Sequence, residues 1–403
     1  YNALIEALSW LHYVVVSPLG KSDEGGADWL KKRHHPVLPR PAETRRIWIH
    51  AVSAGESKVA ELLRQQLIEL DPATSVVLSS TTYSGYNRIR RAAGDEASFI
   101  MPLDTLPEQS RLFERLKPDL LVLVESEYWP AQFAAAEAAG VPVVVVNATL
   151  SVRSFARHRR FPAIARRTLA KARRIYPQDE QTLARYRDLG VPADRLDLAG
   201  NLKLAPLGNL PPPDRTRPTL TFGNIHADEL DVLAPAIVEL HQRRPARRIV
   251  MVPRYPGRIP VDELRRRFGP GLDVVEDLAS TDAALVWLDR MGALADAYAR
   301  SDLAVVCGTF APIGGHDLSE PLQLGAASLY GPQVERQRAL DIALKGMDAA
   351  VQVSSAAELP DAVLHLLDHP AEREAMVARY RALSEAAAQR LVEVAVDLLR
   401  VAQ

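Results

Sequence analysis

The sequence predicts an α/β protein of two Rossmann-like, doubly wound domains, each built on a parallel sheet. The chain has 403 residues, more than one hydrophobic core usually supports. Short runs rich in β-branched residues alternate with longer amphipathic segments, which is typical of parallel sheets covered by helices. The alternation stops at the proline-rich residues 207–213 and then begins again. Two such sheets predict a ligand cleft at the carboxyl ends of their strands.

The expected strands are the short apolar runs. In the first half they are residues 47–51, 75–79, 98–101, 119–124, 142–147 and 174–177. In the second half they are residues 219–223, 248–252, 272–276, 284–288, 303–307, 327–330 and 350–353. A helix is expected over residues 58–70, where Val59, Leu62, Leu63 and Leu67 recur at helical spacing.

The predicted domain boundaries follow from this alternation. They give an N-terminal segment, a first domain, a linker, a second domain and a helical tail, at residues 1–20, 21–206, 207–217, 218–370 and 371–403. Residues 1–18 are apolar but interrupted by Glu6, which fits a helix on a membrane surface or a plain packing helix. The basic residues Lys31, Lys32 and Arg33 favour the membrane surface.

Composition and motifs exclude several classes of protein. A formal net charge of −1 argues against a dedicated nucleic-acid binder. The single cysteine, Cys307, lies in an apolar run, which excludes an internal disulfide and a cysteine zinc cluster. No Gly-x-Gly-x-x-Gly motif follows the first strand and no P-loop motif occurs, so neither a dinucleotide oxidoreductase nor a P-loop enzyme is indicated.

A first candidate site follows the first strand. Small residues and Gly55 allow a tight turn there, and the next helix is expected to begin near Glu56 or Ser57. A carboxylate at this position can take a proton from an acceptor hydroxyl. Alternatively, Glu56 only complements the helix dipole. His50, a strand residue, is the second choice for the base.

A second candidate site follows the buried strand that contains Cys307. Gly314 and Gly315 open onto a helix N-terminus, whose free backbone N–H groups suit a phosphate. Glu320 lies where a carboxylate can accept both ribose hydroxyls, and Arg254 follows another strand at the same sheet edge. An ordinary strand-to-helix turn capped by Asp317, with Arg254 a surface residue, is the alternative.

These residues resemble the 3-deoxy-manno-octulosonic acid (Kdo) transferases of lipopolysaccharide synthesis. The matching blocks run in order along nearly the whole chain. They are WIHAVSAGE at 48–56, ESEYWP at 125–130, VNATLS at 146–151, GNLK at 200–203, VPR at 252–254, MG at 291–292, GGH at 314–316 and EP at 320–321.

The resemblance implies a GT-B fold and an inverting transfer of Kdo from CMP-Kdo to a lipid A precursor. It implies an acceptor site in the first domain, a nucleotide-sugar site in the second, and a place on the cytoplasmic face of the inner membrane. Glu56 matches the family's catalytic base. The nucleotide positions are Pro253, Arg254, Met291, Gly292, Ala293, Gly314, Gly315, His316, Asp317, Leu318, Ser319 and Glu320. No cofactor or metal is expected, because the helix N-terminus and Arg254 can neutralise the leaving phosphate.

Several positions depart from the family pattern. Asp317 stands where the family usually has Asn, Ala293 replaces an acid, and the block at 223–226 is GNIH. A UDP- or GDP-sugar donor, a non-transferring sugar-nucleotide epimerase and a non-catalytic relative are therefore alternatives. The apolar N-terminus argues against a soluble epimerase, and the retained Glu56 argues against a non-catalytic protein.

A basic run predicts the acceptor side. Nine basic residues and no acid occur between positions 153 and 174, which favours contact with anions over a merely solvated face. We expect an anionic glycolipid and the membrane surface as partners, and no nucleic acid. The expected acceptor-binding residues are Ser53, Gly55, Glu127, Arg157, Arg159 and Arg160.

Overall fold

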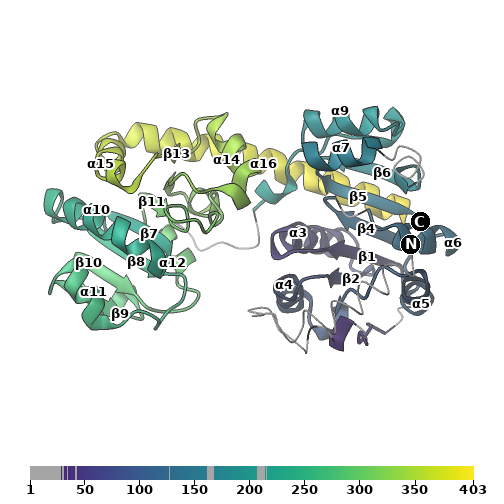
Figure 1. Ribbon diagram of the computed structural model, residues 1–403, viewed down its shortest axis with the longest axis horizontal. Coiled ribbons are helices and arrows are strands. Elements are labelled where there is room, and N and C mark those ends of the chain that lie inside the picture. The colour runs from purple at the N-terminus through teal and green to yellow at the C-terminus, as the bar shows by residue number, and fades with distance from the viewer. Residues whose placement is uncertain are drawn as a thin grey trace. The chain divides into compact units, whose positions relative to one another are not determined.

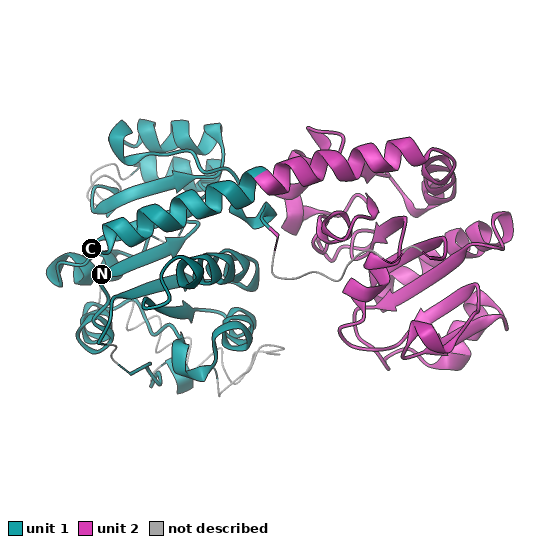
Figure 2. Ribbon diagram, turned by 180° about the vertical axis from the view of Figure 1, so that it is seen from behind, with its two compact units in different colours: residues 1–205, 386–403 teal, residues 206–385 magenta. Residues whose placement is uncertain are grey.

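The computed structural model describes residues 29, 31–33, 35–40, 43–126, 128–160, 168–206, 214 and 216–403. The chain divides into two compact units (Figure 2). Unit 1 takes residues 1–205 and 386–403, and unit 2 takes residues 206–385. Most of the predicted linker, 207–217, and the whole predicted N-terminal segment, 1–20, lie outside the described residues.

Unit 1 is built on a six-stranded parallel sheet in the order β3-β2-β1-β4-β5-β6 (Figure 1). Its strands are β1 Arg46–Ala51, β2 Ser75–Ser80, β3 Ser98–Ile100, β4 Leu120–Val124, β5 Val143–Ala148 and β6 Ala172–Pro177. Its helices are α3 Ala54–Leu70, α4 Tyr83–Ala93, α5 Leu106–Leu116, α6 Pro130–Ala138, α7 Val152–Arg160 and α9 Glu180–Asp188. Every residue of β1, β4 and β5 is buried, as expected for strands covered on both faces.

Unit 2 is built on a seven-stranded parallel sheet in the order β13-β12-β11-β7-β8-β10-β9. Its strands are β7 Thr219–Ile225, β8 Arg248–Pro253, β9 Leu272–Val275, β10 Leu285–Leu288, β11 Leu303–Val306, β12 Ala327–Tyr330 and β13 Val351–Gln352. Its helices are α10 Leu230–Arg243, α11 Val261–Phe268, α12 Leu294–Ala299, α13 Glu320–Gln323, α14 Arg338–Lys345 and α15 Leu359–Asp368.

The two sheets confirm the predicted fold class, and each expected strand is present within a few residues of its predicted bounds. The first helix, expected to begin near Glu56 or Ser57, begins two residues before Glu56, at Ala54. Ser53 is its N-cap and supplies the side-chain oxygen that this position favours. The apolar spacing begins only at Val59 and therefore says nothing about the first turn.

The predicted tail, 371–403, is part of one helix, α16 Pro370–Val401. The boundary between the units falls inside this helix, at residues 385 and 386. Near its C-terminus, Asp397 pairs with Arg174 at 3.3 Å and accepts a hydrogen bond from Tyr176, both on β6. Arg390 pairs with Asp197. These contacts explain why the end of the helix belongs with unit 1.

Within the described part of the chain, no helix is both long enough and apolar enough to span a membrane.

Candidate active site

In unit 1 the residues of interest lie where parallel strands end. β4 pairs with β1 on one side and β5 on the other, so the carboxyl ends of these three strands are neighbours. Glu56 lies in the first turn of α3, the helix after β1; the residue after β4 is Glu125, and Asn147 lies near the end of β5. One edge of the sheet therefore brings together three blocks that are far apart in the sequence.

Glu56 occupies the third helical position of α3 and closes the helix end. Ser53 Oγ donates to Glu56 Oε1 at 2.8 Å, and the Val52 N–H donates to Oε2 at 2.8 Å. The Glu56 N–H in turn donates to Ser53 Oγ at 3.4 Å. This reciprocal pattern is close to a capping box. The helix-end role that the sequence allowed for Glu56 is thus present, and Ser53 acts as the cap.

Glu56 also belongs to a charged cluster. Burial raises its pKa, the nearby carboxylate of Glu125 raises it further, and the ammonium of Lys203 lowers it. Glu125 and Lys203 form an ion pair. A Cβ placed on Gly55 would lie 4.0 Å from Lys203 Nζ, so the ammonium is close to the first turn of α3. An acid with a raised pKa can accept a proton from a substrate near neutral pH.

Backbone strain marks the same edge. Glu125 has φ of 64° and Asn147 has φ of 49°, in a region that costs a residue with a side chain about 1–2 kcal/mol. Asn147 Oδ1 accepts a hydrogen bond from the Leu202 N–H at 2.9 Å. That bond holds residues 200–203, and with them Lys203, beside the ends of β4 and β5.

The alternative base, His50, is in a different environment. It is fully buried in β1, and its Nδ1 lies 2.8 Å from Ser79 Oγ. Burial lowers its pKa to about 3, so the ring stays neutral and acts as a hydrogen-bonding core residue. An acceptor hydroxyl cannot reach it, which leaves Glu56 as the candidate base.

Part of the basic run is paired with acids. Lys171 pairs with Glu137 at 2.8 Å and Arg174 pairs with Asp397, so acids from distant elements neutralise two of its members. Arg166, Arg167 and the predicted acceptor residue Glu127 lie outside the described residues. Five exposed arginines remain, and none forms an ion pair with another described residue: Arg153, Arg157, Arg159 and Arg160 on α7, and Arg173 on β6.

In unit 2 the predicted nucleotide residues also gather at one sheet edge. Strands β11, β7, β8 and β10 are adjacent in that order. The glycine-rich loop follows β11, His226 follows β7, Arg254 follows β8, and Met291 and Gly292 follow β10. This arrangement is that of a binding site at the carboxyl ends of a parallel sheet.

Glycines make the loop after β11 possible. Gly308, Gly314 and Gly315 have φ of 75°, 97° and 87°. A Cβ on Gly308 would lie 2.6 Å from His316 Cδ2, and one on Gly314 would lie 2.8 Å from Arg336 Cγ. The missing side chains thus allow an imidazole and an arginine stem to pack directly on the loop.

Two histidines and two arginines lie near this loop. His226 Nε2 and His316 Nε2 lie 2.8 Å apart in rings stacked at 16°. The pKa of His316 falls to about 4, first through burial and then through His226, Arg254 and Arg336. Burial and then Arg254 also lower the pKa of His226. Arg254 and Arg336 thus disfavour a positive charge on the neighbouring histidines. The same two charges favour the binding of an anion beside them.

Arg254 and Arg336 are exposed, and neither has an acidic partner among the residues described. The Arg254 guanidinium lies 5.5 Å from the centre of the Tyr255 ring, and Arg258 lies 4.3 Å from the same ring. The Arg254 N–H donates to the Ile225 carbonyl at 2.8 Å, which joins the turn after β8 to β7. Arg336 was not predicted from the sequence, because it belongs to no matched block.

The remaining predicted nucleotide positions differ in accessibility. Leu318, Ser319 and Ala293 are buried, so their side chains cannot offer much surface to a ligand. Asp317 Oδ1 accepts from the Ser319 N–H at 3.0 Å and from Ser319 Oγ at 2.6 Å, but the N-cap of α13 is Ser319, so the cap role considered for Asp317 is wrong. Met291 is 67% exposed. Pro253 ends β8, and Glu320 begins α13.

Sequence reasoning missed Glu229, which ties the site together. Its side chain is fully buried. Oε2 accepts from the Gly308 N–H at 2.7 Å and the His226 N–H at 3.2 Å, and Oε1 accepts from the Phe310 N–H at 2.9 Å. Burial raises the pKa of Glu229, and these hydrogen bonds offset only part of that rise. The one available signal was a glutamate three residues after His226, the spacing of a capping box.

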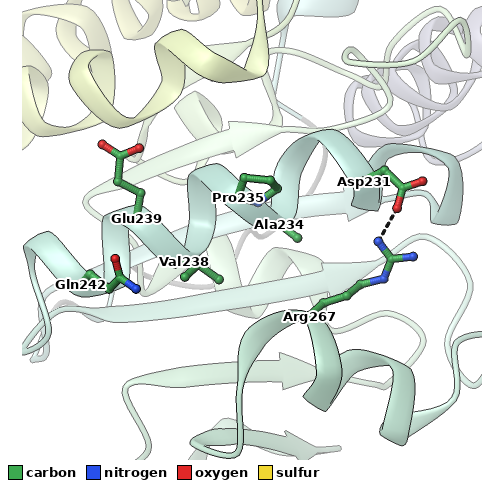
Figure 3. A pocket seen from close by; sticks show the side chains of 7 residues that line it. All are labelled: Asp231, Ala234, Pro235, Val238, Glu239, Gln242 and Arg267. Atoms are coloured by element: carbon green, nitrogen blue, oxygen red, sulfur yellow. Dashed lines mark hydrogen bonds and ion pairs between the residues drawn. The ribbon is translucent and has the colours of Figure 1, made fainter.

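A separate hollow lies on α10 and α11 (Figure 3). Its volume is about 520 Å³, and Arg267 and Asp231, which form an ion pair, are among its lining residues. It shares no lining residue with the site at the sheet edge.

Comparison with known proteins identifies relatives over most of the chain. Residues 28–205 match the family model of 3-deoxy-D-manno-octulosonic-acid transferase (kdotransferase). The chain is 30% identical to the 3-deoxy-D-manno-octulosonic acid transferase of Chlamydophila psittaci over 348 residues, covering 82% of this chain and 79% of that one. It is 30% identical to that of Bordetella pertussis over 365 residues, covering 84% and 83%.

Solved structures support the fold. A UDP-GlcNAc 2-epimerase from Neisseria meningitidis matches with a TM-score of 0.57 at 14% identity, covering 88% of this chain and 99% of that one. MurG from Acinetobacter baumannii matches with a TM-score of 0.56 at 15% identity and the same coverage. The fold is therefore GT-B, and at these identities the likeness concerns the fold alone.

Glu229→Gln tests whether one carboxylate organises the second site. An amide has one acceptor oxygen, so a buried backbone N–H would face an NH₂ group, at a cost of about 1–3 kcal/mol. We expect a lower thermal midpoint for the variant. Glu239→Gln is the control, because Glu239 is exposed on α10 and such changes usually stay within about 0.5 kcal/mol. Equal midpoints for the two variants would contradict this role.

Proposed function

Because this chain belongs to the 3-deoxy-D-manno-octulosonic acid (Kdo) transferase family, we propose that it transfers Kdo, or a related 2-keto sugar acid, from a CMP-sugar to a lipid A precursor. The observation that carries the donor side is the cationic sheet edge of unit 2, with Arg254 and Arg336 beside the loop of Gly314 and Gly315. Family membership favours transfer over the epimerase and non-catalytic alternatives. A different nucleotide base remains the second candidate, because Asp317 and Ala293 depart from the family pattern.

In this proposal the leaving group is CMP. The Arg254 guanidinium pairs with its phosphate, and Arg336, whose side chain packs at Gly314, supplies a second positive charge. Guanidinium–phosphate hydrogen bonds are charge-assisted and strengthen as the phosphate gains charge in the transition state. These groups neutralise the departing charge, so the transfer step needs no metal ion.

Glu56 acts as the general base. A hydroxyl of the acceptor attacks the anomeric carbon of the sugar as the bond from that carbon to the CMP phosphate oxygen breaks. The hydroxyl proton passes to the Glu56 carboxylate, and CMP leaves with the bonding electron pair. The pKa of Glu56 is raised towards neutral pH. A general base works best when its pKa is near the working pH, because it is then largely ionised and still binds a proton well.

The exposed arginines of α7 are proposed to contact the acceptor. Four of them lie on one short helix that follows β5, the strand next to β4. A lipid A precursor carries phosphates, and arginine binds phosphate in a bidentate manner. We place the protein at the cytoplasmic face of the inner membrane, held on anionic lipid.

Arg254→Ala tests the donor site. Removing a charge-assisted contact should weaken CMP binding by roughly 10- to 100-fold in calorimetry. Arg258→Ala is the matched control, since Arg258 lies over the same Tyr255 ring, and it should bind CMP like the wild type. Tighter binding of UDP or GDP than of CMP would reject the CMP-sugar donor and leave the fold unaffected.

Glu56→Gln tests the base. The substitution keeps the shape but removes the proton acceptor, so kcat should fall by roughly 10²- to 10⁴-fold while CMP affinity is kept. Glu69→Gln on the same helix should retain wild-type turnover, since Glu69 is exposed in the last turn of α3. If Glu56→Gln turns over normally, Glu56 serves only the helix end.

The pH profile of kcat gives a second readout for Glu56. A base with a raised pKa loses activity as pH falls through that pKa, above the ordinary range of a glutamate. Lys203→Met removes a charge that lowers this pKa and should move the acid limb to higher pH. Glu125→Gln removes a charge that raises it and should move the limb to lower pH. An acid limb that stays fixed in both variants belongs to another group.

The triple change of Arg157, Arg159 and Arg160 to Ser tests the acceptor surface. We expect a higher KM for the lipid acceptor, weaker binding to anionic liposomes and unchanged CMP affinity. Salt should weaken liposome binding of the wild type, since exposed charges are screened within about 8 Å at physiological ionic strength. The control is the triple change of Arg90, Arg91 and Arg111 to Ser, which removes the same charge elsewhere on unit 1. Equal losses in both triples would mean a general charge effect instead of an acceptor site.

A further inference from the structure

Three metal-ligand side chains gather where α15 meets α16. His365 lies in the last turn of α15, His369 is the residue that ends it, and Glu372 lies in the first turn of α16. One ligand atom from each lies within 4.8 Å of the others. All three residues are exposed, and none belongs to the proposed donor or acceptor site.

The bend between the helices explains how residues seven positions apart meet. Pro370 begins α16, and a residue before proline is disfavoured in helical conformation. His369 accordingly has φ of −120° and ψ of 73°. The chain turns there, and Glu372 folds back until its Oε2 lies 2.9 Å from His365 Nε2.

The hydrogen bonds of the two histidines indicate which ring nitrogens can bind an ion. His369 Nδ1 lies 2.7 Å from the His365 carbonyl oxygen, which can only accept, so Nδ1 carries the proton. The lone pair of His369 therefore lies on Nε2. This is the usual second contact of a metal-binding histidine, with its other ring nitrogen donating to a carbonyl. His365 Nε2 faces the Glu372 carboxylate, so an ion can replace the proton between them.

The neighbouring charged side chains of Asp368 and Arg373 make contacts with groups other than the three ligands. Asp368 makes hydrogen bonds of 2.6 and 2.7 Å with Arg244. Arg373 donates to the carbonyl of Leu366 and, at 2.9 Å, to that of Leu367 at the end of α15. These arginines hold the helix ends in place around the three ligands. The rings of His365 and His369 are stacked, with centroids 4.2 Å apart, and because an imidazole binds an ion in its ring plane, zinc binding requires these exposed rings to rotate.

We propose that His365, His369 and Glu372 bind one divalent transition-metal ion of the zinc type, which clamps α15 to the start of α16. Two imidazoles and one carboxylate form a donor set that zinc prefers, with water in the remaining position. Magnesium and calcium prefer oxygen ligands alone. The ion is structural and takes no part in the sugar transfer. Cys307 does not compete for it, because that thiol is buried.

Zinc uptake by the full-length, tag-free, EDTA-treated protein tests the proposal. Calorimetry with zinc chloride should give saturable binding of one ion per chain, and zinc should raise the thermal midpoint. His365→Gln, His369→Gln and Glu372→Gln should each weaken binding by roughly 10-fold or more. All three residues are exposed, so circular dichroism should show the wild-type fold without zinc.

Two controls keep the test specific. His35→Gln removes an exposed histidine that is far from the three ligands in the sequence, and Glu374→Gln removes an exposed acid two residues from Glu372. Both should bind zinc like the wild type. The proposal is overturned by the absence of saturable binding, by ligand variants that bind zinc as tightly as the wild type, or by magnesium binding as tightly as zinc.

Discussion

Parallel strand direction is the constraint on which the sites depend. When every strand of a sheet runs the same way, all the loops that follow the strands meet at one edge. In unit 1 this edge gathers Glu56, Glu125 and Lys203, and in unit 2 it gathers His226, Arg254 and His316. The helices contribute mainly by covering the strands, which leaves the edge as the place where polar groups can collect without being buried in the core.

The two edges have opposite electrostatic character. In unit 1 two carboxylates share one ammonium, so the cluster has surplus negative charge and the pKa of Glu56 rises. In unit 2 two arginines and two neutral histidines surround a glycine loop, and the pKa values of the histidines fall. A base that accepts a proton and a cationic site that stabilises a leaving anion are the two halves of an inverting group transfer. The proposed function assigns one half to each unit.

Glu229 shows how a buried acid can support a cationic site without neutralising it. Its oxygens are occupied by backbone N–H groups from the loops after β7 and β11. The carboxylate thus fixes both loops while Arg254 and Arg336 keep no acidic partner among the described residues. Lys203 is held in a related way, through the Asn147 side chain and residues 200–203. In both units a buried or strained residue positions the groups that would meet substrate.

The sequence by itself determined the two-sheet fold, the position of each strand, the glycine loop and the place of Glu56 after the first strand. Those signals are local, because β-branched runs, helical spacing and glycines act over a few neighbouring residues. Only the tertiary structure decided which charges meet: Glu229 with the loop after β11, Lys203 with Glu125, Arg336 beneath Gly314, and Lys171 with Glu137. It also showed that Lys171 and Arg174 of the nine-residue basic run are paired with acids, and that four arginines without an acidic partner among the described residues lie together on α7. Charge pairing depends on which distant segments the sheet brings together, and no local period in the sequence encodes that.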